Sequence, residues 1–168
     1  MVMDTKQPFE KLVELHGASV LRVCRAVVGP LDAEDVWQET FLSALRAYPE
    51  LPPDANVEAW LVTIAHRRSL DAVRAARRRA VPVEAVPEGH SRLGNPAPPD
   101  DGVWGHVAHL PDKQRRVIAY RYLGDLPFGE IAAIVGGTAA AARRSAADGL
   151  RKLRTLVSAD LLPEGDHS

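Results

Sequence analysis

Six arginines cluster in one short stretch of the sequence and are the first candidates for binding chemistry. They are Arg67, Arg68, Arg74, Arg77, Arg78 and Arg79. A solvated helix face explains one or two arginines well and six poorly, and only Asp71 opposes them. A guanidinium forms paired hydrogen bonds with phosphate oxygens, so such a density of them favours contact with a polyanion. The stretch predicts a nucleic-acid surface, provided that the neighbouring motifs agree.

A second basic site is expected near the C-terminus, after a run of small residues. Thr138 precedes Ala139–Ala142, and the paired Arg143 and Arg144 follow. Threonine caps helices well, and alanine forms helices whose slim surface approaches DNA closely. An adjacent arginine binds guanine bidentately or holds phosphate. The candidates for DNA reading are Thr138, Ala140, Arg143 and Arg144. An ordinary helical hairpin with solvated arginines is the alternative.

Acidic side chains spaced for one helix face suggest a third kind of chemistry. They are Asp32, Asp35 and Glu39. Paired carboxylates hold Mg²⁺, as in an all-α metal-dependent nucleotide hydrolase. Such an enzyme usually needs a second acidic helix, and Phe9–Val28 offers only Glu10 and Glu14. His106 and His109 lack a third ligand nearby. We therefore expect no metal, no cofactor, no catalytic residue and no small-molecule substrate.

These residues fall in segments whose apolar side chains recur at helical spacing. The expected helices are Phe9–Val28, Asp32–Tyr48, Asn56–Arg79, Val103–His109, Pro111–Leu123, Phe128–Val135 and Thr138–Val157. Asp32 is expected to cap the second helix. Gly136 separates the last two helices, which together predict a helix-turn-helix. The stripe Leu150, Leu153, Leu156 and Val157 is expected to pack inward.

Composition changes between residues 81 and 101. Val81–Asp101 contains five prolines and two glycines without apolar periodicity, which predicts an extended, mobile linker. The fold class expected is all-α, with two small helical domains joined by a flexible Pro-rich linker. The expected boundaries are 1–80, 81–101 for the linker, and 102–168 for the helix-turn-helix domain. Two basic modules on a tether would grip nucleic acid at two separated places.

The charge is segregated along a nearly neutral chain. The net charge is −1, and 46% of the residues are apolar, which is enough for real cores. The single cysteine, Cys24, excludes an internal disulfide and lies in an apolar helical run, so we expect it to be buried. The sequence has neither a run of about 18 apolar residues nor a signal-peptide pattern. We expect no membrane insertion and a cytoplasmic location.

Three stretches together carry a family resemblance. They are LDAEDVWQETFLSALRAY (Leu31–Tyr48), AWLVTIAHRRSLDAVRAARRR (Ala59–Arg79) and LPDKQRRVIAYRYLGDLPFGEIAAIVGGT (Leu110–Thr138). In this order, the chain resembles an extracytoplasmic-function sigma factor of the bacterial sigma-70 family. The first domain is then sigma2-like and the last sigma4-like. The implied partners are core RNA polymerase and promoter DNA, with an anti-sigma factor as a possible third.

The resemblance implies a role for each site. Core-polymerase binding falls to Asp35, Gln38 and Glu39, and the loop Pro49–Ala55 captures a flipped base of the minus-ten element. The surface that meets and opens the minus-ten region comprises Asn56, Arg67, Arg68, Arg74, Arg77 and Arg78. The recognition helix, Thr138–Arg154, reads the minus-thirty-five element through Thr138, Ala140, Arg143 and Arg144. Opening the strands needs no covalent chemistry.

The chain also departs from the family pattern. Pro127 stands where relatives often have a serine cap, and residues 139–145 read AAAARRS instead of a pattern like GTVKSR. The departures affect the upstream sequence that is read, not the expected fold. A stand-alone helix-turn-helix regulator would leave DAEDVWQETF unexplained. A protein-interaction adaptor would not depend on either arginine cluster.

Overall fold

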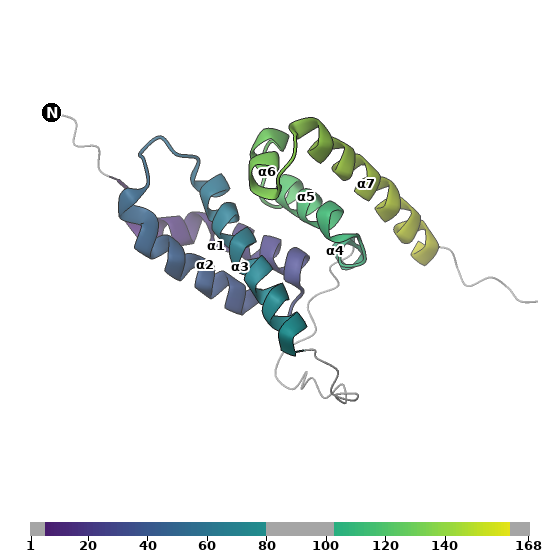
Figure 1. Cartoon of the computed structure of the whole chain (residues 1–168), viewed down its shortest axis with the longest axis horizontal. Helices are drawn as coiled ribbons and strands as arrows, with labels where there is room; N and C mark the ends of the chain where they lie inside the picture. Colours follow the sequence, from purple (N-terminus) through teal and green to yellow (C-terminus); the bar gives the residue numbers. More distant parts are fainter. Residues whose placement is uncertain (1–5, 80–102, 162–168) are drawn as a thin grey trace, which may run out of the picture.

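The computed structural model describes residues 6–79 and 103–161, and every regular element in these ranges is helical. The elements are α1 (Phe9–Val28), α2 (Ala33–Ala47), the 3₁₀ turn η1 (Tyr48–Glu50), α3 (Val57–Arg79), α4 (Val103–Val107), α5 (Asp112–Tyr122), α6 (Phe128–Val135) and α7 (Ala139–Leu161). Figure 1 shows two groups of helices, α1–α3 and α4–α7. The all-α prediction is confirmed. The predicted linker Val81–Asp101 lies outside the described residues.

The N-terminal module packs α1, α2 and α3 around one apolar core. Its buried side chains recur at three- and four-residue spacing and include Val20, Cys24, Val36, Phe41, Leu61 and Ala65. Fully burying a large apolar side chain contributes about 1.5–3 kcal/mol, so this periodicity decides which face of each helix points inward. Cys24 is completely buried, as predicted, and burial raises the pKa of its thiol to about 12.

The ends of these helices follow local rules with one exception. Gly29 ends α1 at φ +86°, a region open mainly to glycine, and its N–H donates to the carbonyl of Arg25. The Oδ1 of Asn56 accepts a 3.1 Å hydrogen bond from the Ala59 N–H and caps α3. The cap predicted from Asp32 is wrong, because that side chain makes no capping hydrogen bond to α2.

The C-terminal module is the predicted helix-turn-helix, with α5 packed against α6 and α7. Thr138 caps α7 as predicted, since its Oγ1 accepts a 3.0 Å hydrogen bond from the Ala141 N–H. Gly149 is a contact point: an added Cβ there would lie 2.4 Å from Cδ1 of Ile118 on α5. A glycine in mid-helix therefore lets α7 approach α5 closely. The packing stripe was wrong at Leu150, which is 37% exposed.

The two modules are packed against each other along a shared seam. One apolar cluster joins side chains of both modules: Val23, Ala26, Val27, Ala59 and Val62 with Val117, Ala119, Tyr120, Leu126, Ile131, Ala142 and Ala146. Two hydrogen bonds cross the seam, from Ser19 Oγ to the Leu123 carbonyl at 2.8 Å and between His66 Nδ1 and Tyr120 Oη at 2.6 Å. The sequence predicted two domains but not this contact between them.

Candidate nucleic-acid and protein-docking surfaces

The acidic surface on α2 is produced by the amphipathic pattern of that helix. Ala33, Val36 and Ala44 face the core, which turns Asp35, Gln38 and Glu39 outward into solvent. Asp35 lies in the first turn, where the helix dipole favours a negative charge. The structure therefore brings the three predicted docking residues together on one exposed helix face.

Apolar surface continues this acidic face along α2. Leu42 and Leu45 are 55% and 50% exposed and follow Asp35 and Gln38 at helical spacing. Exposed leucines next to charged residues are typical of protein contact sites rather than of nucleic-acid sites. These leucines were not among the site residues predicted from the sequence. The positions of Leu42 and Leu45 relative to the buried Val36 and Ala44 place them on another face of the helix, and this spacing could have identified them.

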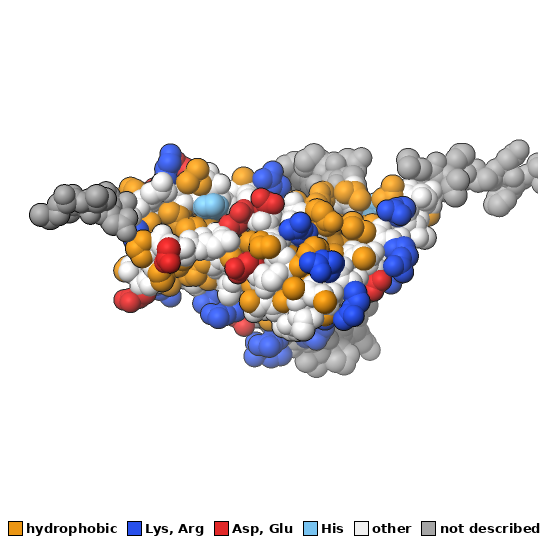
Figure 2. Space-filling view, turned by 90° about the horizontal axis from the view of Figure 1, so that it is seen from above, with side chains coloured by type: hydrophobic (Ala, Val, Ile, Leu, Met, Phe, Trp, Pro, Cys, Tyr) orange, Lys and Arg blue, Asp and Glu red, His pale blue; other side chains and the backbone are white. Residues whose placement is uncertain are grey.

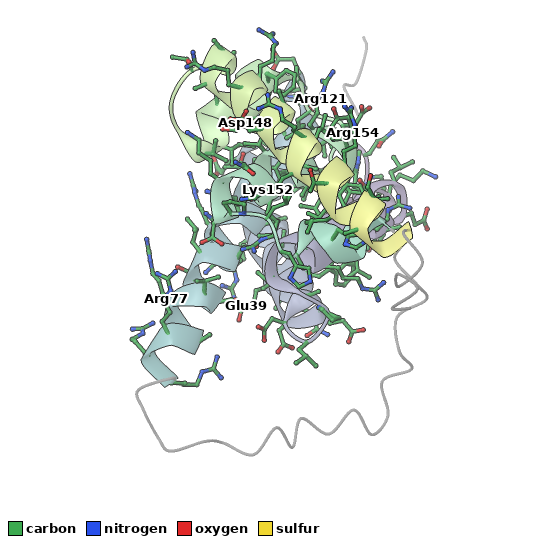
Figure 3. All side chains as sticks on the ribbon, turned by 90° about the vertical axis from the view of Figure 1, so that its right-hand side faces the viewer. Glu39, Arg77, Arg121, Asp148, Lys152 and Arg154 are labelled. Atoms are coloured by element: carbon green, nitrogen blue, oxygen red, sulfur yellow. The ribbon has the colours of Figure 1, made fainter. Side chains whose placement is uncertain are left out.

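A groove places the acidic face beside the basic end of α3. Its volume is about 330 Å³, and its lining includes Asp35, Glu39 and Asp71 together with Arg78 and Arg79. Figure 3 shows Glu39 on α2 and Arg77 on the neighbouring α3. Two surfaces that sequence analysis assigned to different partners are thus adjacent on one module.

The basic half of α3 is largely free of intramolecular partners. Arg67, Arg74, Arg77 and Arg78 are exposed, and no carboxylate among the described residues pairs with them. Arg68 is different: it donates to Ser43 Oγ at 2.9 Å and lies 3.5 Å from Asp71. Unpaired guanidiniums need no bond broken before they bind phosphate. Arg74, Arg77 and Arg78 lie on the C-terminal turns of α3, which project away from the seam (Figure 1), whereas Arg67 lies near the middle of the helix.

The loop between α2 and α3 is held by residues that sequence analysis did not consider. The Nζ of Lys6 donates to the Leu51 carbonyl at 2.7 Å and also to the carbonyl of Tyr48. The hydroxyl of Tyr48 donates to the Gln7 carbonyl. The segment before α1 therefore fixes both the start of the loop and the buried Leu51, and leaves Pro52 and Pro53 exposed.

The recognition helix presents small side chains and two arginines to solvent. Ala140, Arg143 and Arg144 are exposed, and Thr138 is exposed although its hydroxyl oxygen caps the helix. Ala142 and Ala146 face inward against the module. In the view of Figure 2, Lys and Arg side chains spread over the half of the surface formed by the C-terminal helices. The four predicted residues therefore lie together at the start of α7.

The seam contains a histidine kept neutral by its surroundings. Burial, together with the positive charges of Arg116 and Arg67, lowers the pKa of His66 to about 4. A neutral imidazole carries one ring nitrogen without a proton, so it can share this hydrogen bond with the Tyr120 hydroxyl without a charge in the seam. No sequence motif indicated this pair, because the two residues are 54 positions apart.

The described part of the chain contains neither a cluster of potential metal ligands nor a membrane-spanning helix. Within residues 6–79 and 103–161, no three His, Cys, Asp or Glu side chains lie close enough to hold an ion. None of the helices in these ranges is both long and apolar enough to span a bilayer.

Two family models match the two modules. Sigma-70 region 2 matches residues 12–79, and sigma-70 region 4 matches residues 107–155. The chain is 32% identical to the ECF RNA polymerase sigma factor SigD of Mycobacterium tuberculosis over 180 residues, which cover 99% of this chain and 83% of SigD. It is 34% identical to the RNA polymerase sigma factor CarQ of Myxococcus xanthus, with 89% and 88% covered.

Solved structures agree with the fold. One similar structure is CnrH in complex with the cytosolic domain of CnrY, with a TM-score of 0.64, 26% identity, and 90% of this chain and 88% of that chain covered. The sigma factor RpoE of Bartonella quintana, solved with the anti-sigma factor NepR, has a TM-score of 0.73 at 20% identity over 90% of this chain and 98% of that chain. The matched regions, their order and these relatives lead to one conclusion: the chain belongs to the extracytoplasmic-function RNA polymerase sigma factors of the sigma-70 family.

Proposed function

We propose that this sigma factor divides its work between the three surfaces described above. As a family member it binds core RNA polymerase and directs promoter recognition and transcription initiation. The proposal concerns which residues do so. It rests chiefly on one observation: the acidic face of α2, the unpaired arginines of α3 and the slim start of α7 are all exposed.

Docking on core polymerase is assigned to the outer face of α2. Asp35, Gln38 and Glu39 supply charged and amide groups, and Leu42 and Leu45 supply apolar area beside them. Interfaces of this kind combine an apolar centre with a polar rim. The face is independent of the core of the module, so substitutions on it leave the fold intact.

Opening of the minus-ten region is assigned to α3 and to the loop before it. The arginines hold the phosphates of the duplex, and the loop Pro49–Ala55 receives an unpaired base. Base flipping costs a few kcal/mol, and a pocket that binds the flipped base offsets that cost. Strand opening is then driven by binding energy and requires no covalent chemistry. Asn56 lies at this loop, and its Oδ1 also serves as the cap of α3.

Upstream reading is assigned to α7. The exposed Ala140 gives the helix a narrow profile, and Arg143 and Arg144 carry the hydrogen-bond donors that base edges and phosphates accept. Thr138 fixes the start of the helix, and thereby the positions of these side chains relative to the major groove of the DNA.

Binding both promoter elements requires the seam to open. Elements centred roughly 25 base pairs apart are separated by about 85 Å at about 3.4 Å per base pair. A compact chain of this length has a radius of gyration of only about 15 Å. The packed arrangement therefore corresponds to the free or inhibited protein. We place the protein in the cytoplasm, where it acts with polymerase once the seam is open. The similar sigma factor RpoE was solved with the anti-sigma factor NepR, and such a partner would favour the packed arrangement here.

A titration against core polymerase tests the docking assignment. The double variant Asp35→Ala with Gln38→Ala is expected to bind core polymerase at least tenfold more weakly, with unchanged helical content by circular dichroism. Glu10→Ala on α1, also exposed, is the matched control. Unchanged affinity of the double variant would refute the α2 face. Failure of the wild-type chain to bind core polymerase, with retained binding to duplex DNA, would favour a stand-alone regulator.

A further inference from the structure

An aromatic ring of α6 contacts an arginine of the recognition helix. Phe128 is the first residue of α6 and is half-buried against the shared core. The guanidinium carbon of Arg143 lies over this ring, 5.3 Å from its centroid. The guanidinium carbon of Arg121, on the last turn of α5, lies 4.8 Å from the same centroid. Cations from two helices therefore share one ring, and cation–π attraction favours both positions.

Arg121 and Phe128 form the fixed part of this stack. The Nη1 of Arg121 donates to the Leu126 carbonyl at 3.1 Å. Leu126 is 1% exposed, and its own N–H donates to the Tyr120 carbonyl at 3.1 Å. The ring is thus backed by the buried part of the module, and Figure 3 shows Arg121 within this group of helices. Arg143 is the outer member, exposed on the surface of α7.

The neighbouring arginine has no such support. Arg144 is exposed, and within the described ranges it makes no hydrogen bond, ion pair or ring contact. Neither Arg121 nor Arg143 has a carboxylate partner in the part of the chain that the structure describes. Two adjacent arginines of identical charge therefore differ in one respect: the direction of Arg143 is constrained, and the direction of Arg144 is not.

We propose that Phe128 is a positioning residue that orients Arg143 for sequence-specific readout of the upstream promoter element. The inference rests on the proposed function, because it requires α7 to lie on that element. An arginine that reads a guanine must direct two N–H donors of its guanidinium at O6 and N7 of the base. A freely rotating arginine reaches the nearest phosphate equally well and carries no sequence information. Constraint of the side chain before binding therefore favours specificity over uniform affinity.

The test measures base discrimination by the holoenzyme assembled from the full chain and core polymerase. Promoter fragments randomised in the upstream window are first selected with the wild-type holoenzyme. Affinities are then measured on the selected duplex and on duplexes with each single-base substitution. The variants are Phe128→Leu, Phe128→Tyr, Arg143→Ala and Arg144→Ala. The leucine removes the ring and keeps an apolar side chain, whereas the tyrosine keeps the ring.

The expected pattern is confined to one position of the element. Arg143→Ala abolishes discrimination at that position, and Phe128→Leu lowers discrimination there roughly two- to fivefold. Phe128→Tyr retains wild-type discrimination. Arg144→Ala weakens all duplexes to the same extent. In the Arg143→Ala background, Phe128→Leu produces no further change in discrimination, because its effect acts through Arg143.

Three results would contradict either the positioning role of Phe128 or the assignment on which it rests. Full discrimination by Phe128→Leu, with loss in Arg143→Ala, would refute the positioning role and leave the assignment of α7 intact. Wild-type discrimination by Arg143→Ala at every position would refute the assignment of this arginine to base readout. If Phe128→Leu proves too unstable to assemble, Phe128→Met replaces it, since methionine preserves volume and lacks the ring. An additive loss in the double variant would show a purely structural effect.

Discussion

The two helices to which we assign DNA binding, α3 and α7, differ in how their arginines are held. The C-terminal turns of α3 carry many arginines, most of them exposed and unpaired, and they project from the core. The start of α7 carries only two, and one of these is stacked on a ring fixed to the core. On α3, the arginines thus provide a high density of positive charge without a fixed side-chain direction. On α7, Arg143 provides hydrogen-bond donors whose direction is constrained.

This difference corresponds to two components of promoter binding. Phosphate contacts depend on charge and salt and are indifferent to sequence, whereas base contacts depend on geometry. A helix that must hold DNA while it opens benefits from charge that follows the moving backbone. A helix that must read a base benefits from an arginine whose direction is set in advance.

The largest expected effect comes from removing charge on α3. In the triple variant Arg74→Gln, Arg77→Gln, Arg78→Gln, promoter binding by the holoenzyme is expected to fall by roughly two to three orders of magnitude at 0.1 M salt if all three contact phosphate. The slope of log affinity against log salt is expected to shrink by about 2.7. Salt-dependent titration measures both quantities. An unchanged slope would show that these arginines do not contact phosphate, and would contradict the electrostatic role assigned to α3.

The next largest effect concerns α7. Arg143→Ala is expected to cost about 1–3 kcal/mol on the preferred upstream sequence and much less on substituted sequences. Arg144→Ala is expected to cost less, to the same extent on every sequence. Fluorescence anisotropy of labelled duplexes bound by the holoenzyme provides the measurement. Equal, sequence-independent losses for both variants would mean that α7 holds phosphate only, like α3.

The attachment of α7 to the module is tested by Gly149→Ala. An added Cβ would lie 2.4 Å from Cδ1 of Ile118, so the substitution overpacks the α5–α7 contact. We expect the free energy of unfolding to fall by about 1–3 kcal/mol, although alanine has the higher helix propensity. Urea titration measures the change. The exposed control Ala147→Gly is expected to lose only helix propensity, and stabilisation by Gly149→Ala would show that α5 and α7 are not in close contact.

A smaller effect is expected at the seam that packs α1 and α3 against α5 and α6. Tyr120→Phe removes the hydrogen bond to His66 and keeps the buried ring. We expect a loss of about 0.5–1.5 kcal/mol in the stability of the packed form. Distance measurement by fluorescence transfer between labels on α2 and α7 is expected to show more of the separated form. Identical distance distributions in both proteins would mean that this bond does not contribute to closure.

A further effect at the seam is a dependence of stability on pH. The pKa of His66 is about 4 in the folded protein and about 6.5 in an unfolded chain, so the unfolded state binds the proton more tightly. The contribution of neutral His66 is therefore complete above about pH 6.5 and is lost as the pH falls toward 4. Burial raises the pKa of Glu58, which acts in the opposite sense. The free energy of unfolding is measured against pH for the wild type and for His66→Gln, and the contribution of Glu58 cancels in the difference. Parallel profiles for the two proteins would contradict the assignment of the pH dependence to His66.

Much of this protein was predictable from local pattern. Apolar periodicity gave the helix Phe9–Val28 to the residue, and the cap at Thr138 followed from residue type. The outward direction of Asp35, Gln38 and Glu39 follows from the same periodicity, because inward and outward faces of one helix are set by its own sequence. The Asp32 cap failed because a suitable residue at an N-cap position need not adopt capping geometry.

Other features depend on side chains that are distant along the chain. The exposure of Leu42 and Leu45 required knowing that no other helix covers that face of α2. The exposure of Leu150 on α7 had the same origin. The ring under Arg143 was equally hidden, since Phe128 resembles an ordinary core residue until Arg121 and Arg143 are seen over it.

The sequence by itself determined the helices, their inward faces, the order of the two modules and the family. Each of these depends on spacing within a short segment or on the order of segments, and both are visible in one dimension. The tertiary structure alone decided that the modules share a core, that His66 meets Tyr120, and that Gly149 brings α7 onto α5. These contacts join residues whose separation along the chain carries no periodic signal, so only packing in three dimensions selects them.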